Sequence, residues 1–185
     1  YAELVHDRLT AMDPANAQYY ADNLDRFRDR VAQMDQAIRA AVATVPESNR
    51  KLLTYHDSWA YFAKQYGMEV IGAVQPSNFS QPSVREVAKL IDQVKELGLP
   101  AVFGSEVFSS DVLEAIATEA NAQFIDDLAD DDLPGKPGDP EHSYLGLMQK
   151  NLGAMIPALG GDARVLAGLD IENVFDGASG AIYPQ

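Results

Sequence analysis

Three side chains that can bind a divalent cation each follow a short apolar segment of the sequence: His56, Glu106 and Asp126. An imidazole and two carboxylates are ligands that Zn²⁺ and related cations accept, provided that the fold brings the three groups together. The same groups are suited to general acid–base catalysis. Polar residues are common wherever a strand gives way to a loop, so a solvated sheet edge without any ligand is the alternative interpretation.

The segments before these side chains alternate with helical patterns, and the alternation indicates how the three groups are positioned. Strands are expected at four places, residues 52–55, 69–74, 100–104 and 122–125. Strands that alternate with helices through short links are typical of a parallel sheet, in which all carboxyl ends meet at one edge. We therefore predict an α/β fold with a four-stranded, mainly parallel sheet flanked by helices. Open sheets of this kind bind ligands at that edge.

A helix longer than a compact domain requires precedes the sheet. Asp13 and Pro14 are typical of a helix start, as N-cap and first helical residue, and helical periodicity continues to about Thr44. At 1.5 Å per residue this helix would be about 45 Å long. We divide the chain into a short helix at residues 1–12, this long linking helix at residues 13–46, and an α/β unit at residues 47–185.

The composition narrows the class of partner and of chemistry. The chain has 185 residues, a net charge of −14 and no cysteine. Such an acidic chain lacks the basic surface that nucleic acids require, and without cysteine it can form neither disulfides nor thiolate metal sites. The sequence contains no run of about 18 apolar residues. It also contains no glycine-rich phosphate loop and no nucleophile motif of a serine hydrolase.

Two polar residues near the expected last helix, at residues 144–159, have less evident roles. Asn151 falls next to the apolar stripe of that helix, where a buried amide must find hydrogen-bond partners. We expect a structural role for it. His142 lies in the loop before the helix, and we expect it at the surface rather than in the site.

Several stretches of the chain resemble one known family. They read TYHDSWAYFAKQYGM, then PSVREVAKLIDQVKELGLPAVFGSEVFSSDVLEAIATEANAQFIDDLAD, then SYLGLMQKNL. In matching order, from about residue 13 to residue 159, they resemble the C-terminal half of the zinc/manganese ABC-transporter solute-binding proteins (cluster A-I). These receptors are periplasmic or lipid-anchored outside the membrane, and their two α/β lobes are joined by one rigid helix, which DPANAQYYADNLDRF resembles. The resemblance implies capture of Zn²⁺ or Mn²⁺ and its delivery to a membrane permease.

The resemblance also implies roles for individual residues. His56, in HDSWAYF, matches a metal ligand of the family, and Asp126, in FIDDL, matches its carboxylate ligand. Glu106 matches a glutamate near the site that would hydrogen-bond the ligand imidazole. Asp127 is the alternative carboxylate if the match is shifted by one residue. An imidazole at the position of His56 favours Zn²⁺ over Mn²⁺.

The family takes its two other ligands, both histidines, from an N-terminal lobe that these residues do not include. We expect residues 1–12 to be the last helix of that lobe, and we do not expect His6 to be a ligand. Two protein ligands would bind metal weakly, because water fills the remaining coordination positions. Without that lobe an apolar face would be exposed, and a homodimer of the chain would be one way to cover it.

Two other functions stay open on the sequence alone. A metal-dependent hydrolase or acid–base enzyme could use His56, Glu106 and Asp126, but it would need a substrate pocket and an open coordination position. Adhesion is the other, because receptors of this family are described as surface adhesins in some bacteria. We expect a binding protein rather than an enzyme.

Overall fold

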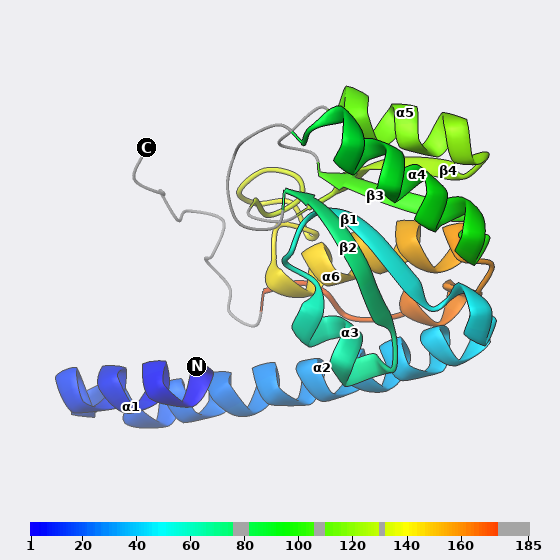
Figure 1. Cartoon of the computed structure of the whole chain (residues 1–185). Coiled ribbons are helices and arrows are strands. Elements are labelled where there is room, and N and C mark those ends of the chain that lie inside the picture. Colours follow the sequence, from blue (N-terminus) through cyan, green and yellow to red (C-terminus); the bar gives the residue numbers. More distant parts are fainter. Residues whose placement is uncertain (76–81, 106–109, 130–131, 174–185) are drawn as a thin grey trace.

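A parallel sheet forms the centre of the α/β unit (Figure 1). The computed structural model describes residues 1–75, 82–105, 110–129 and 132–173. Its strands are β1 (Lys51–His56), β2 (Glu69–Gln75), β3 (Ala101–Ser105) and β4 (Gln123–Leu128). They lie in the order β2-β1-β3-β4, and each neighbouring pair is parallel. The predicted α/β fold with a four-stranded parallel sheet is confirmed.

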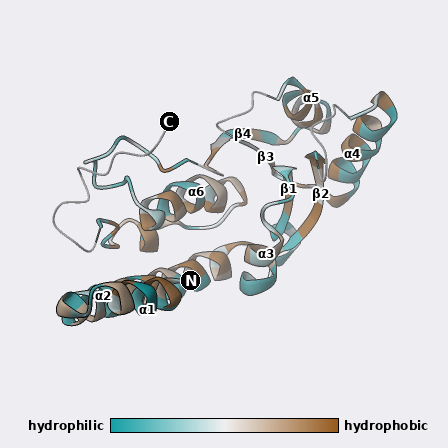
Figure 2. Cartoon of the chain, turned by 90° about the vertical axis from the view of Figure 1, so that its left-hand side faces the viewer, coloured by the Kyte–Doolittle hydropathy of each residue, from teal (hydrophilic) through white to brown (hydrophobic). Residues whose placement is uncertain are grey.

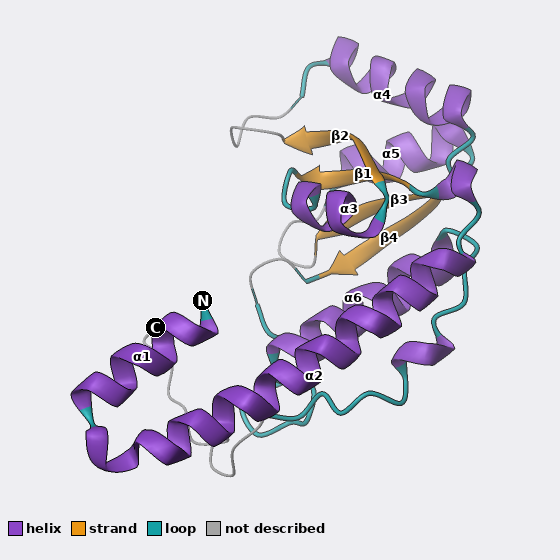
Figure 3. Cartoon of the chain, turned by 90° about the horizontal axis from the view of Figure 1, so that it is seen from below, coloured by secondary structure: helices purple, strands orange, loops and turns teal. Residues whose placement is uncertain are grey.

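Helices cover both faces of this sheet. They are α2 (Ala17–Thr44), α3 (Ala60–Tyr66), α4 (Val84–Leu97), α5 (Asp111–Ala120) and α6 (Tyr144–Ala158). Helices α4 and α5 lie on one face, and α2, α3 and α6 lie on the other (Figure 3). Because side chains alternate along a strand, Leu52 of β1 packs with α2 and α6, whereas the next residue, Leu53, packs with α4 and α5.

The helix ends on the α4–α5 face follow from local sequence. Ser83 caps α4: its hydroxyl accepts a hydrogen bond from the Glu86 amide, and its own amide donates to the Glu86 carboxylate, 2.7 Å away. Gly98 ends α4 with a φ of 60°, a conformation that suits glycine because it has no Cβ. The β3 strand begins only three residues later, and its last residue, Ser105, is paired with Leu128 at the end of β4.

Helix α1 (Ala2–Met12) and helix α2 form a hairpin that extends from the body of the protein (Figures 1 and 2). The buried residues of α2 all lie in its second half: Met34, Ala37, Ile38, Ala41 and Val42. Helix α1 has no buried residue, and its exposed side chains include Leu4, Val5 and Met12. In the described part of the chain no helix is both long and apolar enough to cross a membrane.

The start of α2 differs from the prediction. Pro14–Asn16 form a single 3₁₀ turn, and the α-helix begins at Ala17. The Asp13 carboxylate accepts hydrogen bonds from the Asn16 amide group at 2.7 Å and the Tyr20 hydroxyl at 2.9 Å. These side-chain hydrogen bonds lower the pKa of Asp13. Asp13 is thus the N-cap residue and Pro14 the first residue, as predicted, but of a 3₁₀ turn rather than of the α-helix itself.

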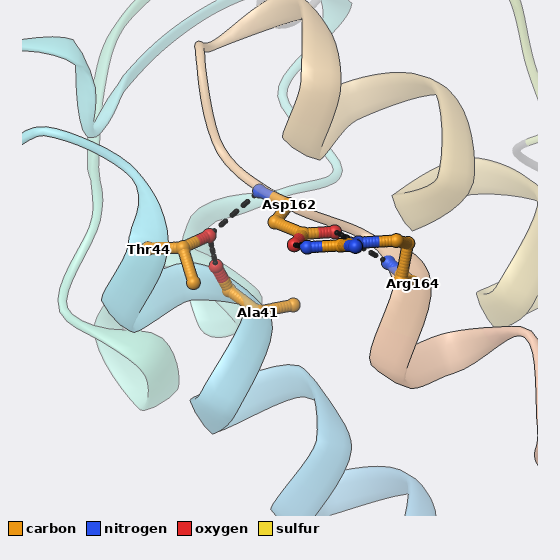
Figure 4. A network of polar contacts seen from close by, with 4 residues as sticks. All are labelled: Ala41, Thr44, Asp162 and Arg164. Atoms are coloured by element: carbon orange, nitrogen blue, oxygen red, sulfur yellow. Dashed lines mark hydrogen bonds and ion pairs between the residues drawn. The ribbon is translucent and has the colours of Figure 1, made fainter.

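The segment after α6 runs back along α2. The Thr44 hydroxyl at the end of α2 donates to the Ala41 carbonyl at 2.6 Å and accepts from the Asp162 amide at 2.7 Å (Figure 4). Further along, Arg30 forms an ion pair with Asp170, with a nitrogen–oxygen distance of 2.5 Å. Residues 159–173 thus fasten the second half of α2 to the α/β unit.

Candidate metal centre

His56 is the last residue of β1, so the strand extends one residue further than predicted. Its carbonyl accepts a hydrogen bond from the Thr54 hydroxyl at 2.7 Å, and its half-buried ring meets the Tyr55 ring edge-on, with centroids 4.6 Å apart. Three residues later Trp59, 7% exposed, packs edge-on against Phe62. The end of β1 that carries the imidazole is therefore anchored by Thr54 within the strand and by Trp59 after it.

Asp126 is exposed and lies inside β4, not in the loop after it as predicted. The reason is an irregularity in the pairing of β3 with β4. Phe103 is paired with Ile125, but Ser105 is paired with Leu128, so β4 holds one extra residue over this interval. This is a β-bulge, a feature that re-aims side chains and is frequent beside functional sites. Asp126 and Asp127 are the residues of the bulge.

His56 and Asp126 lie at the same edge of the sheet with one strand between them. Thr54 is level with Phe103 of β3, which is in turn level with Ile125 of β4. His56 comes two residues after Thr54, and Asp126 comes directly after Ile125. Since neighbouring strands are about 4.8 Å apart, the backbones of β1 and β4 are separated by roughly 10 Å. An imidazole from one strand and a carboxylate from the other are long enough to bind one ion between them across such a gap.

A groove of about 370 Å³ adjoins this edge between α3 and α6. Ser58 and Trp59, just after His56, line one side, and Ala129, three residues after Asp126, lies on the other. Asn151 of α6 also lines it, and at 1% exposure it is buried and hydrogen-bonded as predicted. The two segments that carry the predicted ligands therefore border one concave surface.

The other predicted residues are placed less fully. Glu106 lies outside the described residues, as does the side chain of Asp127. His142 is half-buried, with its Nδ1 atom 3.1 Å from the Pro134 carbonyl oxygen, so it is not the simple surface residue that we expected. Across the described residues, no group of three or more histidine and acidic side chains is close enough to hold a metal ion. His56 and Asp126 share an edge without forming a complete centre.

Sequence reasoning missed two features around Asp126. Gly104 of β3 lies against the bulge: a Cβ atom at this position would be 3.2 Å from the Asp126 Cα. The partner of Asn151 was also missed, and it is the backbone of Ala129. A glycine at the end of a buried strand is the one signal that could have indicated a close approach of this kind.

A polar cluster holds α3 against the long helix. The Tyr66 hydroxyl donates to Asp35 at 2.9 Å, and Asp35 also accepts two hydrogen bonds from Arg39. The bonds from Arg39 lower the pKa of Asp35, while burial, and then the bond to Asp35, raise the pKa of Tyr66 to about 12. The loop of His56 leads directly into α3, so this cluster fixes the element that follows the predicted ligand.

The model of a protein family described as "Zinc-uptake complex component A periplasmic" matches residues 1–158 of the chain. The chain belongs to this family. The match ends where α6 ends, so the segment that fastens α2 lies beyond it. The family consists of solute-binding proteins, which favours the binding protein over the hydrolase hypothesis.

Individual relatives agree with this assignment. The manganese-binding lipoprotein MntA of Bacillus subtilis is 29% identical over 150 residues, which cover 79% of this chain and 49% of MntA. The zinc uptake protein ZnuA of the same organism is 25% identical over 82% of this chain and 47% of its own length. The periplasmic zinc-binding protein TroA of Treponema pallidum has the same fold, with a TM-score of 0.76, 24% identity, and coverage of 85% of this chain and 58% of TroA. The chain thus spans about half the length of the curated relatives it matches.

Proposed function

We propose that the chain is the metal-holding part of an extracytoplasmic receptor, which captures Zn²⁺, or alternatively Mn²⁺, for an ABC transporter permease. The observation that carries the proposal is the placement of His56 and Asp126 at one edge of a parallel sheet in a member of this family. The names of relatives mention zinc in some cases and manganese in others, and they describe lipoproteins or periplasmic proteins. A periplasmic or membrane-anchored location is part of the proposal.

In this proposal the ion is cargo, and each residue has a defined role. A ring nitrogen of His56 and a carboxylate oxygen of Asp126 bind it directly. Glu106 orients the imidazole, and Asp127 is the alternative carboxylate if the match to the family is shifted by one residue. The nitrogen ligand favours Zn²⁺, because this borderline-soft cation accepts imidazole more readily than Mn²⁺ does.

The remaining ligands would come from a second lobe of the same receptor, with residues 1–12 in that lobe, residues 13–46 as the linking helix and residues 47–185 as the metal-holding lobe. In support, the buried residues of α2 are confined to its second half, and α1 has none. A groove of about 820 Å³ also runs between the hairpin and α6, with Leu24, Phe27 and Met148 among its lining residues. A homodimer of the chain would cover the same surface, and sedimentation of the chain alone distinguishes the two arrangements.

We further propose that the protein does not catalyse a reaction on its cargo. A receptor must open the coordination sphere to release its metal ion. A hydrolase must instead keep a metal-bound water next to a bound substrate. Turnover of ester or phosphate substrates by the zinc-loaded chain, lost in His56→Ala, would support the hydrolase instead. Adhesion stays a prediction that no described residue addresses.

Calorimetric titration of Zn²⁺ into the chain tests the ligand roles. We expect weak binding by the wild type and loss of binding in both His56→Ala and Asp126→Ala. His6→Ala is the control, because it removes an imidazole from α1, a helix outside the α/β unit with no buried residue. Binding that persists in His56→Ala and Asp126→Ala would contradict the proposed site, and binding lost in His6→Ala would place the ion on the hairpin.

A further inference from the structure

Asn151 makes an unusual pair of hydrogen bonds at the end of β4. Its side-chain oxygen accepts from the Ala129 amide at 2.7 Å, and its side-chain nitrogen donates to the Ala129 carbonyl at 2.8 Å. Both residues are buried, with exposures of 1% and 3%. One amide side chain therefore satisfies both backbone groups of the residue that follows the strand.

The place of this pair in the sheet explains why it is needed. In the described sheet β4 is the last strand of the order, so it has a neighbouring strand on the β3 side only. Buried backbone groups must be hydrogen-bonded. At Ala129 the side-chain amide of Asn151 provides the hydrogen bonds that a further strand would otherwise provide. Asn151, a residue of α6, thus attaches this helix to the residue that follows β4.

The bulge is confined from its other side by Gly104. The Asp126 Cα would be 3.2 Å from a Cβ atom at Gly104, a distance that real side chains rarely adopt. The backbone of β4 therefore comes close to β3 at the one residue of that strand end that has no side chain. Asp126 lies between these two restraints, opposite Gly104 and three residues before Ala129.

We propose that Asn151 is a positioning residue for the Asp126 carboxylate. Through Ala129 it holds the bulge in the register that presents Asp126 at the carboxyl edge. This inference rests on the proposed function, because it gives Asp126 the role of a metal ligand. Partners that orient a ligand typically change metal affinity by a factor of about 10 to 100 when they are lost.

A purely structural role for Asn151 makes a different prediction. In that case its loss would lower the free energy of unfolding, and the metal affinity of the folded fraction would not change. Gln149 provides the matched control. It lies on the same helix, and its side-chain amide donates to the Leu166 carbonyl at 2.7 Å, on the segment after α6 and away from β4.

The test is calorimetric titration of Zn²⁺ into the full chain carrying Asn151→Ala, Asn151→Leu or Gln149→Ala, alongside denaturant unfolding of each. Asn151→Leu keeps the buried volume and removes only the amide, so it replaces Asn151→Ala if that variant does not fold. We expect a dissociation constant raised about tenfold by either change at Asn151 and unchanged by Gln149→Ala. The unfolding measurements give the folded fraction of each variant, and we expect the change in dissociation constant to exceed any change in that fraction.

The outcomes separate failure of this inference from failure of the proposed function. Zinc binding that is lost in Asp126→Ala but unchanged in both Asn151 variants would overturn the positioning role and leave Asp126 as a ligand. Equal weakening by Asn151→Leu and Gln149→Ala would also overturn it, since any lost amide contact would then suffice. Binding that Asp126→Ala leaves intact would overturn the proposed function and this inference together.

Discussion

The Tyr66 hydroxyl donates a hydrogen bond to the Asp35 carboxylate, 2.9 Å away, and thereby joins α3 to the long helix α2. The Arg39 guanidinium completes the cluster, with its carbon 5.3 Å from the centre of the Tyr66 ring. The residue after α3, Gly67, ends the helix with a φ of 71°. The short helix α3, which follows His56, is therefore held at its C-terminal end by a hydrogen bond to the long helix α2.

We predict that Tyr66→Phe destabilises the protein by about 1 to 2 kcal/mol, because the mutation removes a hydrogen bond to a charged acceptor. Denaturant unfolding measures the effect. Tyr61→Phe on the same helix is the control, since Tyr61 is 90% exposed, and it should leave the free energy of unfolding unchanged. Equal stability of the Tyr66 variant and the wild type would mean that the packed ring, not the hydroxyl, joins the helices.

The raised pKa of Tyr66 predicts a dependence of stability on alkaline pH. The pKa is about 12 in the folded protein and 10 in the reference state, so the neutral phenol is favoured by folding. This contribution is fully present below pH 10 and is lost as the pH rises from about 10 to 12. The unfolding free energy of the wild type should fall over this window more steeply than that of Tyr66→Phe. Parallel curves for the two proteins would contradict the prediction.

Gly104→Ala should weaken zinc binding severalfold, because the added Cβ presses on the Asp126 Cα and on the Phe124 ring, 3.2 and 3.1 Å away. Gly153→Ala on α6 is the matched control. No atom lies within 4 Å of a Cβ at Gly153, so that change should stabilise the helix by about 0.5 to 1 kcal/mol and leave metal affinity unchanged. Unaltered zinc affinity in Gly104→Ala would show that β4 shifts without moving the carboxylate.

Thr44→Val should loosen the segment after α6. The change keeps the shape of the side chain but removes the acceptor of the Asp162 amide, at a cost of up to about 1 kcal/mol. Limited proteolysis should then cut near residues 160–173 faster than in the wild type. Thr118→Val, at an exposed position of α5, is the control. If both variants resist cleavage as the wild type does, the other contacts of the segment, among them those of Arg30 and Gln149, are sufficient to retain it.

The sequence predicted the fold well because the patterns that indicate each strand and helix lie within one short segment of the chain. Strand and helix periodicity indicated the parallel sheet, and the residues after its strands indicated the edge where His56 and Asp126 lie. The bulge at Asp126 could not be predicted, because the residues next to that end of β4, Gly104 and Asn151, are each more than 20 residues away from Asp126 along the chain. The prediction of Asp13 as N-cap and Pro14 as first helical residue is confirmed for the 3₁₀ turn, but the hydrogen bond from Tyr20, seven residues later, was not predicted.

The segment after α6 shows the same limit. Residues 160–173 have little periodicity, and their structure depends on contacts with Thr44 and Arg30, more than 100 residues earlier. Such contacts leave no pattern within the segment itself. For the site, the sequence indicated the side chains that we propose as ligands, but it could not indicate the backbone geometry of the sheet edge that carries them.

The most direct measurement is anomalous X-ray scattering at the zinc edge from crystals of the chain grown with Zn²⁺. The account predicts one zinc ion with a His56 ring nitrogen at about 2.0 to 2.1 Å and an Asp126 carboxylate oxygen at about 2.0 to 2.2 Å. An anomalous peak that touches neither residue, while the sheet edge stays without one, would contradict the central claim that this edge holds the metal.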